Sequence, residues 1–367
     1  MSAKQDIQKL LKKADIRTDG LRDSDITVYD NRVYERVLSD GSLGLGESYM
    51  DGWWTCKRID KMIHKVLKAN LVKEFSINPR TIMLYLKSKL NPQRLRAYNI
   101  GQKHYDIGNN LYSLMLDKNM QYSCAYWKDA KTLDKAQEAK MDLICRKLEL
   151  KKGESLLDIG CGWGGLLRYA AENYGIRGVG LTVSKEQAKY AQEKSKGLPI
   201  EFKIIDYRKY AKKFDKIVSV GMVEHVGPKN YKEFMKTVNR NLKPPGLFLL
   251  HTIGSNKSNN SGDPWIDKYI FPDGVLPSVK QIAKAAEGLF TMEDFHNFGK
   301  YYENTLIEWN KNFQKAWPKL KPQYSERFKR MWEYYLLCCA ATFRARHCHL
   351  WQIVFSKNRE QIYETKR

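Results

Sequence analysis

Short apolar runs alternate with amphipathic segments from about residue 100 to the end of the chain. A helix is predicted over roughly 133–149, where apolar residues recur every three or four positions, and it leads into the strand-like run SLLDIG. Four further runs of this kind follow in order: GVGLTV, EFKIID, DKIVSV and GLFLLHTI. Helices expected at about 302–316 and 325–343 precede a last strand, HLWQIVFS. Because strands and helices alternate at this spacing, the sequence predicts an α/β fold with a doubly wound parallel sheet.

The first part of the chain has helical periodicity of its own. Its clearest helix face combines Ile59, Met62, Ile63, Val66 and Leu67. We therefore expect a smaller, mainly helical domain over 1–90 and a larger domain over 91–367, with a basic linker at about 88–100. The stretch SDGSLGLGESYMDGWW is glycine-rich and too irregular for one helix or strand, so we interpret it as a packed turn rather than a functional loop.

The composition is that of a globular protein with a strong positive charge. Lys and Arg number 64 against 41 Asp and Glu, which gives a net charge of +23 and indicates a polyanionic partner, either nucleic acid or an anionic membrane. Seven cysteines, an odd number without a zinc-type C-x-x-C pair, fit free thiols in a reducing cytosol, and we expect no metal site. No apolar run approaches the roughly 20 residues that span a bilayer, so the protein is expected to be soluble or peripheral.

The segment DIGCGWGG fits two kinds of nucleotide site. It contains G-x-G-x-x-G, typical of dinucleotide binding, and also D-x-G-x-G-x-G, formed by Asp158, Gly160, Gly162 and Gly164. A dinucleotide site needs an acid about 20 residues on to bind a ribose, but the first acid there is Glu186, already inside a predicted helix. The missing acid weakens the oxidoreductase interpretation.

S-adenosylmethionine suits the same loop better. Asp158 would lie near the ammonium of the cofactor, and Asp206, at the end of the third strand, could bind the adenine amino group. LKPPGLFLL resembles the L-K-P-G-G segment of class I methyltransferases. With no acid after the second strand, Thr182 and Gln187 are the candidates for binding the ribose. We therefore expect a class I, Rossmann-like methyltransferase.

VGMVEHVGPKNY places Glu224 and His225 at the end of the fourth strand, where a methyl group would leave the cofactor. A carboxylate here stabilises an acceptor that becomes positively charged, as an alkene does when it attacks a methyl group. The alternatives are that Glu224 caps the next helix and that His225 is a packed histidine.

Long motifs over almost the whole chain resemble the bacterial cyclopropane-fatty-acyl-phospholipid synthases. They are GSLGLGESYMDGWW, KHYDIGN, MQYSCAYW, LDIGCGWGG, VGMVEHVGPKNY, LLHTIG, DPWIDKYIFPDG, LPS, HNFG, YSERFKRMW and FRAR. The N-terminal part distinguishes the chain from the shorter mycolic-acid cyclopropane synthases, which are similar only in the catalytic domain.

The resemblance implies a reaction and its residues. In this family, S-adenosylmethionine supplies a methylene group to a cis double bond of an acyl chain, and a bound bicarbonate removes the proton. By motif, the bicarbonate site comprises Cys124, Glu224, His251, Tyr302 and the Ile253 amide. The implied cofactor contacts are Tyr122 and Ser123 at the amino-acid end, Gly160, Gly162 and Gly164 beneath it, Tyr207 and Arg208 beside the adenine, and Trp163 within the loop. Cys339 matches a thiol considered catalytic in this family, although packing is its expected role.

The resemblance also implies partners and a location. We expect unsaturated phospholipids as substrate, a homodimer, and a cytoplasmic protein that is peripheral on the inner face of the membrane, with no nucleic acid bound. The basic stretch WNKNFQKAWPKLKPQYSERFKRM would contact anionic headgroups, although a solvated surface is its ordinary explanation. Two alternatives stay open: a methyltransferase that leaves a methyl or methylene branch, and an RNA-binding module, which the lack of common RNA-reading motifs disfavours.

Overall fold

The computed structural model describes residues 2–71 and 108–367, which form two compact units. Unit 1 comprises the described part of residues 1–90 together with 261–272 and 306–348, and unit 2 comprises the rest. The sequence had placed 261–272 and 306–348 in the larger domain, whereas the structure groups them with the N-terminal helices. The linker expected at about 88–100 and most of KHYDIGN lie outside the described residues.

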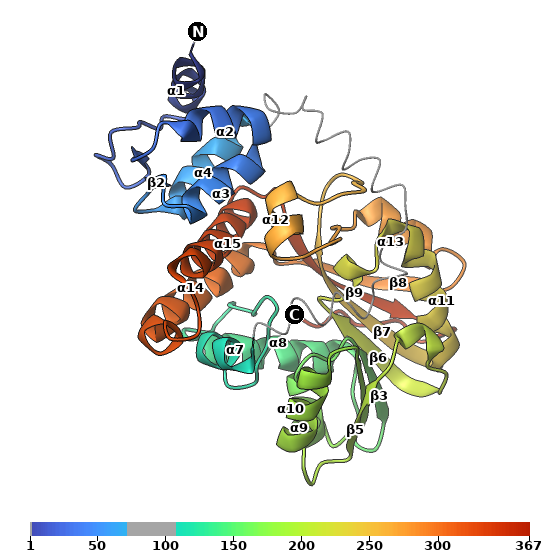
Figure 1. Ribbon diagram of the computed structural model, residues 1–367. Coiled ribbons are helices and arrows are strands. Elements are labelled where there is room, and N and C mark those ends of the chain that lie inside the picture. Colours follow the sequence, from blue (N-terminus) through green and yellow to red (C-terminus); the bar gives the residue numbers. More distant parts are fainter. Residues whose placement is uncertain (1, 72–107) are drawn as a thin grey trace. The chain divides into compact units, whose positions relative to one another are not determined.

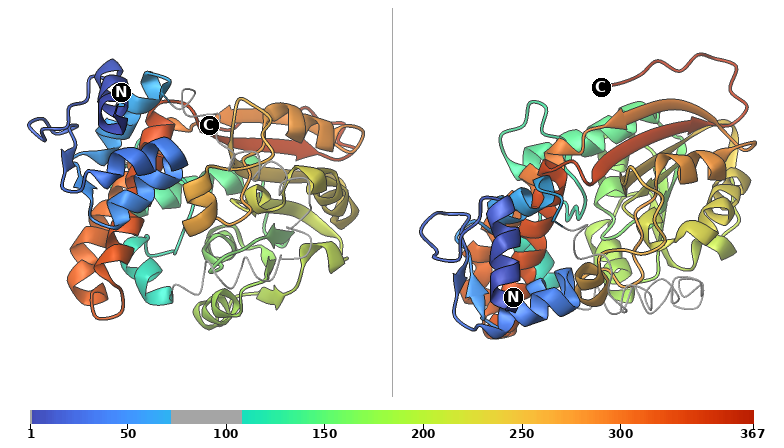
Figure 2. Two further views of the ribbon diagram at one scale, coloured as in Figure 1. Left: turned by 45° about the horizontal axis from the view of Figure 1, so that its top comes forward. Right: turned by 90° about the horizontal axis from the view of Figure 1, so that it is seen from above.

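Unit 2 is built on a seven-stranded sheet with the order β5-β4-β3-β6-β7-β9-β8 (Figure 1). The strands are β3 (Ser155–Ile159), β4 (Arg177–Thr182), β5 (Ile200–Ile204), β6 (Phe214–Val220), β7 (Leu242–Gly254), β8 (Thr291–Asn297) and β9 (His349–Ser356). The five strands from β3 to β7 are parallel, and β9 pairs antiparallel with both β7 and β8. The predicted parallel sheet and last strand are confirmed. Strand β8, which lies beside β9 at the sheet edge (Figure 2), was not predicted.

Helices cover both faces of this sheet, as the alternation of side chains along its strands requires. Leu156, Leu247 and Leu249 pack in one core cluster with α8 (Leu133–Lys147), α9 (Gly165–Tyr174) and α10 (Lys185–Lys194). Their neighbours Leu157, Phe248 and Leu250 belong to the opposite cluster, with α11 (Tyr231–Asn241) and α13 (Val279–Ala286). The fold is therefore a doubly wound α/β fold.

Unit 1 is mainly helical. It contains α1 (Ala3–Lys13), α2 (Arg32–Asp40), α3 (Ser42–Met50), α4 (Ile59–Lys68), α12 (Pro264–Tyr269) and α15 (Glu326–Arg344), with a small sheet of β1 (Thr27–Val28) and β2 (Trp54–Thr55). Helix α14 (Lys300–Leu320) contributes residues to both units, and the short α7 (Asn109–Met115) belongs to unit 2. The helix predicted from Ile59 to Leu67 is confirmed as α4, whose buried residues include Met62 and Ile63.

The packed turn predicted for SDGSLGLGESYMDGWW is wrong, because most of this stretch forms helix α3. Its glycines allow close packing. A Cβ added at Gly44 would lie 2.2 Å from the carbonyl oxygen of Arg36, and one at Gly46 would lie 2.4 Å from the Trp265 ring. Glycine weakens an isolated helix by about 1 kcal/mol relative to alanine, but here tertiary contact outweighs that preference.

Candidate active site

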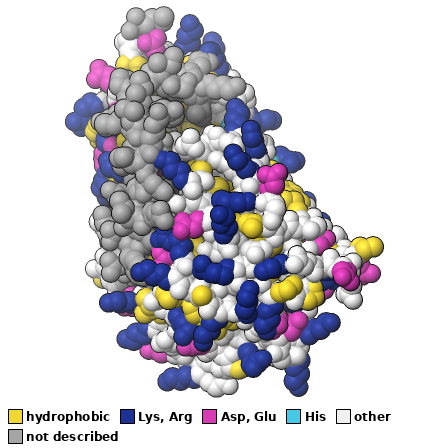
Figure 3. Space-filling view, turned by 90° about the vertical axis from the view of Figure 1, so that its right-hand side faces the viewer, with side chains coloured by type: hydrophobic (Ala, Val, Ile, Leu, Met, Phe, Trp, Pro, Cys, Tyr) yellow, Lys and Arg dark blue, Asp and Glu magenta, His cyan; other side chains and the backbone are white. Residues whose placement is uncertain are grey.

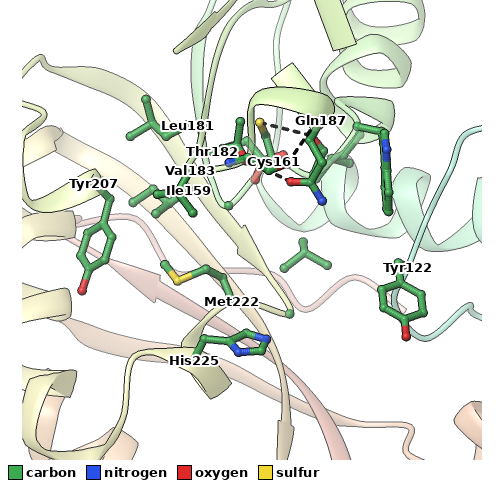
Figure 4. Close-up of a pocket in the computed structure, with 18 of the residues that line it drawn as sticks. Tyr122, Ile159, Cys161, Leu181, Thr182, Val183, Gln187, Tyr207, Met222 and His225 are labelled. Atoms are coloured by element: carbon green, nitrogen blue, oxygen red, sulfur yellow. Dashed lines mark hydrogen bonds between the residues drawn. The ribbon is translucent and has the colours of Figure 1, made fainter. Parts of the chain in front are cut away.

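A cavity of about 200 Å³ opens at the carboxyl ends of β3, β4, β5 and β6, with the loop before α8 as a further wall. The strand order reverses between β3 and β6, and doubly wound folds bind ligands at such a point. Figure 4 shows Tyr122 and Tyr207 on opposite sides of the cavity, with Met222 and His225 between them. The predicted residues that line it are Tyr122, Ser123, Asp158, Gly160, Gly162, Trp163, Thr182, Gln187, Asp206, Tyr207, Arg208 and His225.

The glycine loop forms the floor of the cavity through backbone conformations that glycine adopts easily. Gly160 has φ 87°, and a Cβ there would lie 2.7 Å from the Met222 side chain, so only glycine lets these two strand ends meet. Gly164, which was expected to contact the cofactor, is not among the described residues that line the cavity. A Cβ at this position would lie 2.6 Å from Phe202, so its glycine serves the packing at the start of α9. Trp163 is buried, and its Nε1 donates to Asn109 Oδ1 at 2.9 Å.

The charges of the lining residues favour a cationic ligand over a pyrophosphate. Asp158 is buried beneath the loop, where burial raises its pKa to about 7, and its Oδ1 has no hydrogen-bond partner among the residues that the structure describes. Asp206 is bound by the Arg208 guanidinium, so the charge of this arginine is already balanced. The cavity therefore fits the ammonium of S-adenosylmethionine at Asp158, and the arginine among its described lining residues is already paired and not free for a phosphate.

Thr182 and Gln187, the residues expected to bind the ribose, contact each other within the cavity wall (Figure 4). Thr182 Oγ1 donates to Gln187 Oε1 at 3.0 Å, and the same hydroxyl accepts from the Ser184 amide at 3.1 Å. Ser184 caps the N-terminus of α10. The pair is thus held in place by the β4–α10 turn.

Glu224 lies in the 3₁₀ turn Val223–His225 that follows β6. Its Oε1 accepts a hydrogen bond of 2.7 Å from the Ile253 amide, because the carboxyl ends of the parallel strands β6 and β7 are adjacent. Burial raises the pKa of Glu224 to about 7, and its Oε2 has no hydrogen-bond partner in the described part of the chain. The Ile253 amide, expected to face an external anion, is therefore already bound to Glu224.

His251 is held on β7 by its neighbour on β9. The two are paired in register, and the Gln352 side-chain amide lies 3.3 Å from His251 Nδ1. With the Gln352 nitrogen as donor, the proton of the imidazole is on Nε2, which has no hydrogen-bond partner within residues 2–71 and 108–367. Burial lowers the pKa of His251 well below its usual value, so the ring is neutral.

Cys124 and Tyr302 are also buried in unit 2. The Cys124 thiol donates to the Ala125 carbonyl at 3.3 Å, and burial holds its pKa well above the usual value, so it stays protonated. The adjacent Ala125 amide donates to the Thr305 hydroxyl of α14 at 3.1 Å, one turn from Tyr302. None of Cys124, Glu224, His251, Ile253 and Tyr302 is among the described residues that line the cavity.

The structure places His225 and Cys339, the two remaining candidates, in different units. His225 lines the cavity, where burial lowers its pKa to about 4 and leaves it neutral at physiological pH. Cys339 belongs to α15 in unit 1, and burial raises its pKa, so it has no thiolate character. Among the described residues, no group of three or more His, Cys, Asp or Glu could hold a metal ion.

Sequence reasoning missed several lining residues, including Gln121, Met222 and Asn230. It also missed Lys140, which is fully buried on α8 and bonded to the cavity wall. The signal was present: Lys140 lies four residues after Ala136 and four before Ile144, on the apolar face of its helix.

The sheet, its glycine loop and this cavity define an S-adenosylmethionine-dependent methyltransferase. Residues 93–353 match the family described as mycolic acid cyclopropane synthetase, and the chain belongs to this family. It is 54% identical over 354 residues to the cyclopropane-fatty-acyl-phospholipid synthase of Escherichia coli strain K12, covering 96% of this chain and 93% of that protein. The family resemblance inferred from the motifs is confirmed.

Two solved structures have the same fold over a shorter length. The cyclopropane synthase MmaA2 from Mycobacterium tuberculosis is 30% identical with a TM-score of 0.67, and covers 71% of this chain and 98% of its own. The mycolic acid cyclopropane synthase CmaA1, solved in complex with SAH and CTAB, is 33% identical with a TM-score of 0.66, and has the same coverage. The E. coli protein thus matches a larger share of this chain than either structure does.

Proposed function

We propose that this enzyme transfers a methylene group from S-adenosylmethionine to the cis double bond of unsaturated acyl chains in membrane phospholipids, forming a cyclopropane ring. The observation that carries this proposal is the 54% identity to the E. coli phospholipid synthase, which extends over 96% of the chain. The choice of a phospholipid rests on this match.

In the proposed reaction, the electron pair of the alkene forms a bond to the sulfonium methyl carbon as the carbon–sulfur bond breaks, and S-adenosylhomocysteine leaves. A carbon cation results. Loss of one proton from the transferred methyl group then closes the three-membered ring. The carboxylate of Glu224, buried beside β6 and β7, stabilises the positive charge electrostatically.

We propose a bound bicarbonate as the base that accepts this proton. Two buried groups support an anion that carries a hydroxyl: Glu224 Oε2 can accept from the hydroxyl, and His251 Nε2 can donate to the other oxygens. Neither atom has a hydrogen-bond partner within the described residues. The Ile253 amide would be shared with Glu224, since their 2.7 Å hydrogen bond is already formed. Cys124 would contribute a neutral thiol.

We further propose that the enzyme acts as a homodimer, peripheral to the cytoplasmic face of the membrane. None of the described helices is long and apolar enough to cross a bilayer. Lys and Arg side chains are spread over the face shown in Figure 3, with fewer acidic ones among them. A positive surface of this kind supports association with anionic headgroups.

Product analysis tests the reaction. Vesicles containing a cis-monounsaturated phospholipid are incubated with the enzyme and S-adenosylmethionine, and the lipid is analysed by mass spectrometry with fragmentation. The expected product has gained one CH₂ and lost its double bond. A methyl or methylene branch in the fragments would instead identify the second candidate reaction. Repeating the assay in buffer stripped of carbonate, with bicarbonate then restored, tests the base, and turnover unaffected by stripping would refute it.

A further inference from the structure

Lys140 is a charged side chain on the apolar face of α8 that the proposed reaction does not use. It is 0% exposed, and its ammonium donates hydrogen bonds to Gln121 Oε1 and, at 2.9 Å, to Ser123 Oγ. Both acceptors line the cofactor cavity. A buried ammonium is unfavourable unless it is well paired, so its place directly behind a wall of the cavity calls for a physical reason.

The direction of these hydrogen bonds gives that reason. An ammonium can only donate, so the Ser123 hydroxyl must accept from Lys140 and its own proton is directed elsewhere. Donation from a cation polarises the hydroxyl and makes it a stronger donor to an anion. Ser123 therefore presents a polarised O–H at the cavity wall.

Asp158, a hydrogen-bond acceptor, lines the same cavity as the Ser123 hydroxyl, a donor. Its Oδ1 has no hydrogen-bond partner among the described residues. Burial raises the pKa of this carboxyl, and the nearby charge of Lys140 partly opposes that effect. A carboxylate together with a cation-backed hydroxyl matches a zwitterion, as in the amino-acid tail of S-adenosylmethionine. Tyr207 and Tyr122 lie on opposite sides of the cavity (Figure 4). Tyr207 follows Asp206 in the sequence, and Tyr122 precedes Ser123.

We propose that Lys140 is a positioning residue that orients and polarises the Ser123 hydroxyl to bind the α-carboxylate of the cofactor, while Asp158 binds the ammonium. This inference rests on S-adenosylmethionine as cosubstrate and is independent of the lipid substrate and of bicarbonate. Its test is therefore a measurement of cofactor binding. The result does not depend on which lipid product the enzyme forms.

Gln137, one turn before Lys140 on α8, provides a matched control. Its side-chain amide donates to the main-chain carbonyls of Gln121 at 3.3 Å and Ser123 at 2.8 Å. It therefore holds the same segment through neutral contacts and does not touch the Ser123 hydroxyl. A substitution at Gln137 disturbs the shape of the wall, whereas Lys140→Met removes the charge.

The experiment measures dissociation constants by calorimetry for two ligands: S-adenosylhomocysteine, and its decarboxylated analogue S-adenosyl-3-thiopropylamine, which lacks only the α-carboxylate. Lys140→Met and Ser123→Ala are each expected to weaken the first ligand by about 10- to 100-fold, the loss typical of a hydrogen bond to a charged group. Binding of the second should change by no more than about 3-fold. The double variant should be no weaker than the single variants, since both act through one hydroxyl.

Gln137→Met is expected to weaken both ligands by the same factor. The inference is overturned if Lys140→Met leaves S-adenosylhomocysteine binding unchanged, or weakens the two ligands equally as the control does. Thermal unfolding reports whether each variant is folded. If Lys140→Met does not fold, Lys140→Gln, which also removes the charge but keeps a polar side chain, is measured with the same two ligands, and equal weakening of both there also overturns the inference.

Discussion

At the scale of single residues, the carboxyl of Glu224 determines how the proposed reaction depends on pH. Burial raises its pKa to about 7, so the ionised form that stabilises a cation increases as pH rises through that value. We expect kcat, measured with saturating cofactor and lipid, to rise with an apparent pKa near 7. Glu224→Gln should lower kcat by about 100-fold or more and remove the pH dependence. If Glu224→Gln keeps the pH profile of the wild type, a group other than Glu224 is responsible for the titration.

The same carboxyl should also make the folded state less stable at alkaline pH. Its folded pKa of about 7 exceeds the reference value of 4.5, so the folded state binds this proton more tightly than the unfolded state does. The resulting stabilisation is complete below about pH 4.5 and is lost as pH rises through 7. Relative to the wild type, Glu224→Gln should therefore gain roughly 1–3 kcal/mol in unfolding free energy between pH 5 and pH 8.

Urea denaturation of both proteins at the two pH values measures this difference. Replacing the carboxyl by an amide also changes the unfolding free energy by an amount that does not depend on pH. This amount cancels when the values at pH 5 and pH 8 are subtracted for each protein. Equal pH dependence in the two proteins would show that Glu224 titrates in the folded protein as it does in the unfolded chain.

At the scale of elements, α3 depends on the absence of a side chain at Gly46. Alanine normally stabilises a helix by about 1 kcal/mol relative to glycine. Here its Cβ would lie 2.4 Å from the Trp265 ring, which is itself buried. Overpacking of this kind typically costs about 1–3 kcal/mol, so we expect Gly46→Ala to destabilise the protein.

Chemical denaturation of Gly46→Ala beside Ser42→Ala tests this balance. Ser42 begins the same helix and is only partly buried, so its substitution should be neutral or slightly stabilising. If Gly46→Ala is as stable as Ser42→Ala, the ring of Trp265 can move, and the close packing does not explain the glycine.

The same elements show what the sequence could predict. Four of the five parallel strands, β3, β4, β6 and β7, were predicted from runs that are largely apolar because most of their residues are buried, whereas β5 at the sheet edge alternates and only its Phe202 is buried. Strand β8 (TMEDFHN) was missed because it is at the sheet edge, where only Asp294 is buried. Helix α3 was missed because its glycines are explained only by contacts with residues distant in sequence, such as Trp265. At the site, strand ends located the cofactor loops. Lys140 was missed although it lies on the apolar face of its helix, because lysine is almost never fully buried unless it is paired, and its partners are distant in sequence.

At the scale of the whole molecule, the excess of positive charge is the property most relevant to the proposed phospholipid substrate. The net charge is +23, and part of it lies in the exposed lysines of α14, including Lys315 and Lys319. Each basic residue near an anionic surface contributes about 1 kcal/mol, and salt screens this attraction over about 10 Å at 0.1 M. The attraction to anionic lipid should therefore depend on ionic strength.

We expect binding to anionic phospholipid vesicles, measured by cosedimentation, to weaken by about tenfold or more when salt is raised from roughly 0.05 to 0.3 M. Lys315→Gln combined with Lys319→Gln should weaken binding more than Lys185→Gln combined with Lys189→Gln, exposed positions on α10 that lower the net charge by the same amount. Equal losses in the two pairs would mean that overall charge, rather than the α14 cluster, holds the protein on the membrane. Binding that does not respond to salt would refute electrostatic attachment and leave apolar insertion as its cause.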